Sequence, residues 1–96
     1  PTTREGALHG WHQYVVRVSD RDSFMAHLDA CNIGSGVHYP IPCHLQPLYA
    51  SHPQHAAGAL PVTEAVCADI VSIPVMPLLT DDEVARVIAA VTSWTA

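Results

Sequence analysis

The sequence predicts an α/β fold: a two-layer sandwich in which a small sheet carries helices packed mainly on one face. Short stretches with apolar residues at every second position, typical of half-buried strands, alternate with stretches whose apolar residues recur at helical spacing. The length of 96 residues allows one domain at most, which we take as residues 1–96. The hydrophobic content of 49% lies in the ordinary globular range, so a modest core is expected.

The first expected strand covers residues 12–18, HQYVVRV. Successive side chains of a strand point to opposite faces, so Tyr14, Val16 and Val18 fall on one side. This period of two indicates a strand with one face in the core.

The first expected helix follows at residues 19–31, SDRDSFMAHLDAC, behind a Ser-Asp pair that suits an N-terminal cap. Asn32 and Gly34 come next, and both residue types suit the left-handed conformations that stop a helix. The apolar positions at helical spacing are Phe24, Leu28 and Cys31.

Residues 36–47, GVHYPIPCHLQP, hold three prolines within eight positions. Proline lacks a backbone N–H and biases the preceding residue toward extended geometry, so this segment cannot form a helix or a central strand. The loop continues through residues 40–60, several-fold longer than the usual connection of about 4–6 residues. We therefore expect it to dock on another surface or to form part of a site.

A second helix is expected to begin at Pro61, which suits a first helical turn, with Glu64 near the positive end of the helix dipole. Residues 71–79, VSIPVMPLL, hold two prolines and are expected to be short and extended. The apolar stripe of the helix, expected to form one face, is Val62, Val66 and Ile70.

A capping box opens the last expected helix. Thr80 and Glu83 stand three residues apart, the spacing at which each side chain can bind the other residue's backbone N–H. The residues expected to point inward from this helix are Val84, Val87, Ile88, Val91 and Trp94.

The charged residues limit the function classes open to the chain. Nine acidic residues against four scattered arginines give a net charge of −5, so we expect no nucleic-acid partner. The absence of lysine excludes Schiff-base chemistry by this chain acting alone. No apolar run approaches the about 20 residues of a membrane span, and the first residues do not resemble a signal peptide. We therefore expect no membrane partner and a cytoplasmic location.

Seven histidines raise the question of metal binding. His9 with His12, and His52 with His55, have the spacing of helical ligands, but neither pair has the cysteines or carboxylates that would complete a tetrahedral site. Three cysteines without a CxxC motif indicate neither zinc nor a disulfide framework. We expect no metal site, and a small metal-binding protein remains a third hypothesis that rests on the number of histidines.

The order of several motifs resembles one known family. The motifs are Y-V-V-R-V, G-x-G-V-H-Y-P-x-P-x-H-L-Q-P, L-P-V-T-E and S-I-P-V-M-P-x-L-T-x-x-E-V. Together, from about Tyr14 to Val91, they resemble the C-terminal small domain of the DegT/DnrJ/EryC1/StrS family of pyridoxal-phosphate-dependent sugar aminotransferases. The combination of the two proline-containing motifs is specific, whereas either motif alone is weak.

This resemblance implies the small domain of a fold-type I aminotransferase. Full-length members transfer an amino group, usually from glutamate, to a nucleotide-linked keto-sugar, and they act as homodimers with active sites at the subunit interface. The lysine that binds pyridoxal phosphate lies in a large N-terminal domain, which this sequence does not contain. The resemblance therefore implies a nucleotide-linked sugar and that large domain as partners, and a chain that is inactive alone.

The family's motif also implies which residues bind substrate: His38, Tyr39, His44 and Gln46. It assigns no catalytic, cofactor-binding or metal-binding residue to this chain. Considered without the family, His38 and Tyr39 could instead cap loop carbonyls or pack at an interface. The ring of His44 could hydrogen-bond loop backbone, and Gln46 could do either. Cys43 replaces a usual aliphatic residue and is expected to be a bystander.

Two hypotheses about function follow. The first is the small domain of a nucleotide-sugar aminotransferase, which supplies substrate-pocket and interface residues. The alternative is a stand-alone binding or protein-interaction module derived from such a domain. One departure from the family concerns the segment before the second helix, because residues 58–61, GALP, lack the Asp that the family often has there.

Overall fold

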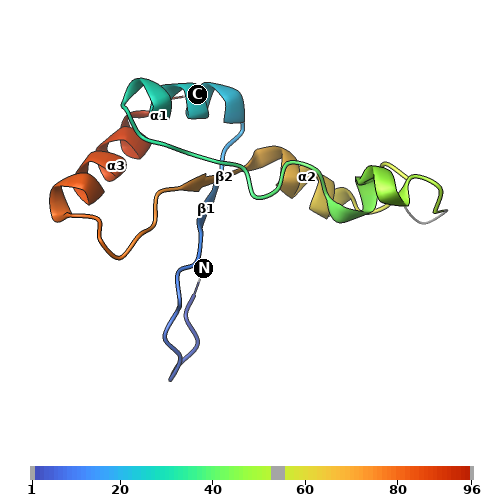
Figure 1. Cartoon of the computed structure of the whole chain (residues 1–96), viewed down its shortest axis with the longest axis horizontal. Helices are drawn as coiled ribbons and strands as arrows, with labels where there is room; N and C mark the ends of the chain where they lie inside the picture. Colours follow the sequence, from blue (N-terminus) through green and yellow to red (C-terminus); the bar gives the residue numbers. More distant parts are fainter. Residues whose placement is uncertain (1, 53–55, 96) are drawn as a thin grey trace.

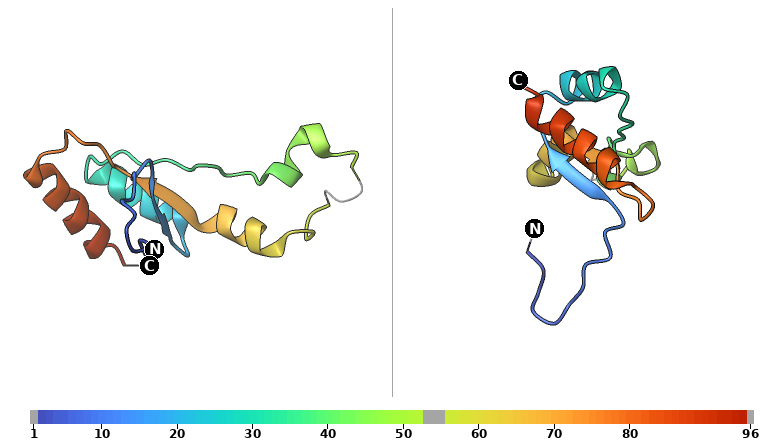
Figure 2. Two further views of the ribbon diagram at one scale, coloured as in Figure 1. Left: turned by 90° about the horizontal axis from the view of Figure 1, so that it is seen from below. Right: turned by 90° about the vertical axis from the view of Figure 1, so that its left-hand side faces the viewer.

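The computed structural model describes residues 2–52 and 56–95 and contains three helices and a two-stranded antiparallel sheet, a mixed α/β arrangement (Figure 1). Helices α1 and α3 lie on the same side of the sheet, as the predicted sandwich requires (Figure 2). No helix among these residues is both long and apolar enough to cross a membrane. In chain order the elements are β1 (Tyr14–Arg17), α1 (Arg21–Ala30), the 3₁₀ turns η1 (Cys43–Leu45) and η2 (Pro47–Tyr49), α2 (Pro61–Asp69), β2 (Ile70–Ile73) and α3 (Asp81–Ser93).

Strand β2 pairs on both of its edges. On one edge it runs antiparallel to β1, with Tyr14 opposite Ile73 and Val16 opposite Val71. On the other edge a single bridge joins Ser72 to Gly36, with N···O distances of 3.1 and 2.7 Å. The extended residues that follow α1 therefore join the sheet at one position only.

The core lies between the sheet and the two helices. Phe24 and Leu28 of α1 are almost fully buried, and the ring of Trp94 meets Phe24 edge-on at a centroid distance of 5.2 Å. Asn32 ends α1 with a left-handed φ of 57°, as predicted, whereas Gly34 has no positive φ. The buried core residues are Phe24, Leu28, Ile33, Val71 and Ala90.

The boundary between the second helix and the next strand differs from the prediction. Ile70 was expected on the apolar stripe of the helix, but α2 ends at Asp69 and Ile70 is the first residue of β2. The reason is a contact between residues that are distant in the sequence. Val18 donates its N–H to the Asp69 carbonyl at 2.9 Å, so the backbone at Asp69 pairs with the segment of the first strand and the helix ends there. The part of the stripe that lies in α2 is not buried, since α2 has no buried residue and Val62 is 77% exposed, whereas Ile70 is buried in β2.

The inward face of α3 is narrower than predicted. Val87, Val91 and Trp94 pack against the core as expected. Val84 and Ile88 were also expected inward, but they are exposed. The smaller Ala90 takes the buried position, because the helix approaches α1 along that side.

Residues 37–52 and 56–69 form an arm that leads away from the core, as Figures 1 and 2 show. The arm contains both 3₁₀ turns and α2, and its loop was predicted either to dock on another surface or to form part of a site. Among the described residues the loop does dock, on the first turn of α2 rather than on the core. Part of the predicted loop, residues 53–55, lies outside the described residues.

The predicted capping box is present at the start of α3. The Glu83 N–H donates to Thr80 Oγ1 at 3.3 Å, and the Thr80 N–H donates to Glu83 Oε2 at 2.8 Å. These bonds satisfy two of the backbone donors that a helix N-terminus leaves without partners. The bond from the Thr80 N–H, followed by a second bond from the Thr80 hydroxyl to the same Oε2 at 2.9 Å, holds the pKa of Glu83 below its usual value.

We predict that Thr80→Ala lowers the free energy of unfolding by about 1 kcal/mol, because the substitution removes the oxygen that accepts from the Glu83 N–H. Chemical denaturation measures this change. Thr92→Ala is the matched control: its hydroxyl bonds only carbonyls of the same helix, so its loss should leave the midpoint near that of the wild type. Equal midpoints for the two variants would show that the cap contributes nothing.

Candidate functional site

His38 lies where the arm leaves the sheet. Its Nδ1 is 2.9 Å from the hydroxyl oxygen of Ser72, a residue of β2 that is only 7% exposed. A hydroxyl can donate or accept, so this bond holds the ring in either neutral tautomer. The ring lies over Gly36, where an added Cβ would stand 3.2 Å from His38 Cε1. The glycine thus makes room for the imidazole.

An open hollow of about 550 Å³ lies beside this histidine. The residues that line it include the polar residues His12, Gln13, His38 and Ser72, and residues 34–36 form another part of the wall. The residues that line it include no carboxylate and no arginine. Hydrogen-bond donors and acceptors without a strong charge suit a neutral hydroxylated ligand better than a charged one.

Tyr39 lies next to His38 but outside the lining of this hollow. Its side chain is 70% exposed, and its ring meets the ring of His38 edge-on at 5.7 Å. The structure therefore brings these two predicted residues together as an exposed aromatic pair at the base of the arm.

The other two predicted residues lie farther along the arm. His44 is only 6% exposed, and its Nε2 lies 2.9 Å from Oε1 of Glu64 in the first turn of α2. An ionised carboxylate can only accept, so His44 Nε2 carries the hydrogen of this bond. The side chain of Gln46 donates to the Ile41 carbonyl at 3.2 Å. Both contacts hold the arm together, and a ligand-binding role for these two residues stays a prediction.

From the sequence, Glu64 was interpreted first as a favourable charge at a helix start and second as a possible catalytic group, and in the structure it is the centre of the arm. Its carboxylate accepts from His44, from the Gly58 N–H at 2.9 Å and from the Leu60 N–H at 3.3 Å. The N-cap residue, Leu60, has no side chain that could cap the helix, and the N–H groups that Glu64 binds are those of Gly58 and Leu60 rather than those of the first helical turn. Gly58 has a φ of 85°, which favours glycine and presents its N–H to the carboxylate.

These hydrogen bonds change the acidity of Glu64. The bond from His44 has the largest effect, the bond from the Gly58 backbone comes next, and together they hold the pKa of this carboxyl below its usual value. The side chain of Glu64 is 23% exposed, so solvent screens the interaction only in part. The ionised form of Glu64 is therefore the one that closes the arm.

Of the histidines considered for metal binding, His9 and His12 have separate surroundings in the structure. His9 stacks on Trp11 at 4.0 Å and accepts the Trp11 N–H, and His12 lines the hollow of His38. His55 lies outside the described residues. Within residues 2–52 and 56–95 no three His, Cys, Asp or Glu side chains converge on a possible metal position.

Comparison with known proteins gives one consistent family. The sequence profile of the DegT/DnrJ/EryC1/StrS aminotransferase family matches residues 1–92. A dTDP-3-amino-3,6-dideoxy-alpha-D-galactopyranose transaminase from Aneurinibacillus thermoaerophilus is 37% identical over 98% of this chain and 25% of its own length. A dTDP-3-amino-3,4,6-trideoxy-alpha-D-glucose transaminase from Streptomyces venezuelae is 40% identical over 98% of this chain and 24% of its own.

A solved structure shares the fold. It is described as the X-ray crystal structure of S. venezuelae DesV in complex with ketimine intermediate, and it is 41% identical with a TM-score of 0.81. The match covers 88% of this chain and 22% of the DesV chain. The present chain thus spans about a quarter of the length of the relatives it matches.

We predict that Glu64→Gln destabilises the protein at neutral pH, and that its difference from the wild type shrinks on acidification. The pKa of Glu64 is depressed in the folded state, so the stability from its ionised form is present above the unfolded value, near 4.5. That contribution is lost as the pH falls through the lower folded value. Denaturation midpoints measured between pH 7 and pH 3, a window set by carboxyl titration, test this prediction.

The matched control for this measurement is Glu5→Gln, which removes an exposed carboxylate from the N-terminal segment. Its midpoint should follow that of the wild type across the whole pH range. A constant difference between Glu64→Gln and the wild type at all pH values would contradict the prediction.

Proposed function

Because the chain belongs to the DegT/DnrJ/EryC1/StrS aminotransferase family, we propose that it is the small C-terminal domain of a pyridoxal-phosphate-dependent nucleotide-sugar aminotransferase. The expected reaction transfers an amino group, with glutamate as the expected donor, to a keto-sugar attached to a nucleotide. The observation that carries this proposal is the family match over residues 1–92. Two relatives named as dTDP-amino-sugar transaminases support the substrate class.

We place the sugar contact at the base of the arm. His38 lines the hollow, and the exposed ring of Tyr39 lies edge-on beside the ring of His38. The uncharged polar lining suits the hydroxyl groups of a sugar ring rather than its phosphates. In this proposal His44 and Gln46 act mainly by holding the loop, so that the two aromatic residues meet a ligand in fixed directions.

The residues of this chain do not fit a site that holds pyridoxal phosphate by itself. The sequence has no lysine for a covalent bond, and the lining of the hollow includes no arginine for the phosphate group. We therefore assign the cofactor to a separate PLP-binding domain. One relative is long enough to contain such a domain. The 94 matched residues are 25% of its length, so this relative has about 376 residues.

The alternative is a stand-alone binding or interaction module. The length of the complete reading frame separates the two proposals, since a frame near the length of the relatives favours the enzyme and one near the length of this chain favours the module. A homodimer and a cytoplasmic location remain predictions for the enzyme.

We predict that the 96-residue chain forms no specific covalent adduct with pyridoxal phosphate, because it has no lysine. Mixing with excess cofactor, reduction with borohydride and peptide mass spectrometry test this. Modification of the terminal amine alone is compatible with the prediction. A stoichiometric adduct at an internal residue would contradict it.

The role of His38 can be tested in the complete enzyme. If its ring binds the sugar, His38→Ala should lower kcat/KM by roughly five- to 150-fold, the loss of about 1–3 kcal/mol expected for one ligand hydrogen bond. Thermal unfolding and the cofactor spectrum report on the fold of the same preparation.

Ser72→Ala provides the control, because it also removes the His38–Ser72 bond but leaves the imidazole in the hollow. If His38 binds the ligand, we expect His38→Ala to lose more activity than Ser72→Ala. Equal destabilisation of both variants with unchanged specific activity would reject His38 as a site residue.

A further inference from the structure

We propose that His27 and Cys31 bind a soft monovalent cation of the Cu(I) class where the C-terminal ends of α1 and α3 meet. His27 lies in the last turn of α1, and Cys31 is the C-cap residue four positions later. Residues four apart on a helix lie on the same side, one above the other. The inference does not depend on the proposed function, because neither residue lines the hollow of His38.

The ring nitrogen Nε2 of His27 has three polar neighbours. It lies 2.9 Å from the carbonyl oxygen of Ala90, 3.3 Å from the hydroxyl oxygen of Ser93 and 3.9 Å from the sulfur of Cys31. Ala90 and Ser93 lie within the last four residues of α3, so the cluster joins the ends of two helices. The thiol of Cys31 is free and half-buried.

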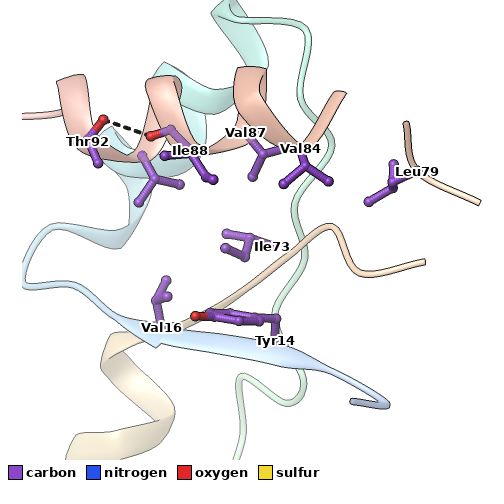
Figure 3. Close-up of a pocket in the computed structure, with 9 residues that line it drawn as sticks. Tyr14, Val16, Ile73, Leu79, Val84, Val87, Ile88 and Thr92 are labelled. Atoms are coloured by element: carbon purple, nitrogen blue, oxygen red, sulfur yellow. Dashed lines mark hydrogen bonds between the residues drawn. The ribbon is translucent and has the colours of Figure 1, made fainter. Parts of the chain in front are cut away.

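An open hollow of about 340 Å³ lies beside this cluster. Its lining includes Cys31, Ser93 and Arg86, and the described residues that line it include no Asp or Glu. A second, apolar hollow, drawn in Figure 3, lies on the opposite side of α3 and is lined by Val84 and Ile88 among others. The two hollows share no lining residue, so the cation site is separate from this apolar surface.

The distance between the two proposed ligand atoms suits a metal ion. Zinc, an ion with a filled d shell like that of Cu(I), binds imidazole nitrogen at about 2.0 Å and thiolate sulfur at about 2.3 Å. An ion between the two atoms therefore holds them about 3.5 Å apart at a tetrahedral angle and about 4.3 Å apart in a straight line. The observed 3.9 Å between Nε2 and the sulfur lies within these limits, so little movement of either side chain is needed.

The surroundings favour a soft monovalent ion over a divalent one. The last carbonyls of a helix carry a partial negative charge, which stabilises a cation at the meeting point of two helix ends. Thiolate and imidazole are both ligands of copper, and Cu(I) is stable with two ligands, whereas structural zinc almost always takes four. Among the described residues no third His, Cys, Asp or Glu joins the pair. One thiolate neutralises a monovalent ion, but it would leave a divalent ion positively charged beside Arg86.

Binding moves two protons and changes no oxidation state. The thiol of Cys31 releases its proton to solvent as the sulfur–copper bond forms. Nε2 of His27 carries a hydrogen in the structure, because the carbonyl of Ala90 can only accept. This hydrogen must pass through solvent to Nδ1, so that the lone pair of Nε2 faces the ion. The carbonyl still has a donor, since the Ser93 hydroxyl donates to it at 3.1 Å.

Anaerobic titration of the 96-residue chain with Cu(I) tests the proposal, with the chromogenic chelator bicinchoninate as competitor. We expect the wild type to hold one equivalent of Cu(I) and Cys31→Ser to hold none. His27→Gln should weaken binding at least about tenfold, because it removes one of two ligands. Cys43→Ser is the matched control: Cys43 is an exposed free thiol outside the cluster, so this variant should bind like the wild type.

Two further measurements make the result independent of how well a variant folds. One equivalent of Cu(I) should raise the thermal midpoint of the wild type and leave that of Cys31→Ser unchanged, because an ion stabilises only the state that binds it. X-ray absorption at the copper edge should show one sulfur and one nitrogen neighbour.

Four results would each overturn the proposal. They are a wild type that retains no Cu(I), binding by Cys31→Ser equal to that of the wild type, loss of the bound equivalent in Cys43→Ser, and a copper ion with sulfur neighbours alone. The last result would place the ion between cysteines of two copies of the chain rather than between His27 and Cys31.

Discussion

The pairing of β2 on both edges is the constraint on which the rest of the structure depends. The backbone of β2 pairs with β1 on one side and with Gly36 on the other. Three segments that are far apart in the sequence therefore meet at this four-residue strand. A sheet made of β1 and β2 alone would have two strands, and such a sheet is only marginally stable without a packed face. Because β2 follows α2 directly, the same strand also fixes where the arm is attached.

The alternation of side chains along β2 couples stability to the candidate site. Val71 points to the core, where it packs with Phe24 and Leu28, and its neighbour Ser72 points to the opposite face, where it holds His38. A shift of one residue in register would exchange these two side chains and destroy both arrangements at once. The position of His38 therefore depends on the packing of the core on the other side of the sheet.

Features that depend on local sequence could be predicted, and features that depend on distant contacts could not. The capping box at Thr80, the strand around Val16 and the left-handed Asn32 follow from short-range patterns, and the structure contains all three. The end of α2 was misplaced because backbone pairing with the first strand decides it. Glu64 was underestimated for the same reason, since its partner His44 lies 20 residues away and a spacing pattern does not show that contact. The one available signal was the absence of a capping side chain before Pro61.

The size of the core explains why so much apolar surface remains open. Five buried residues form the core cluster, whereas the arm, α2 and one side of α3 expose aliphatic side chains. Burial of apolar area is the main source of folding free energy, so a domain that leaves Val84 and Ile88 exposed forgoes part of it. A family polypeptide about four times as long can recover that free energy at the contact between its domains. The proposed function, a domain of a longer enzyme, accounts for both observations, the small core and the exposed apolar side of α3.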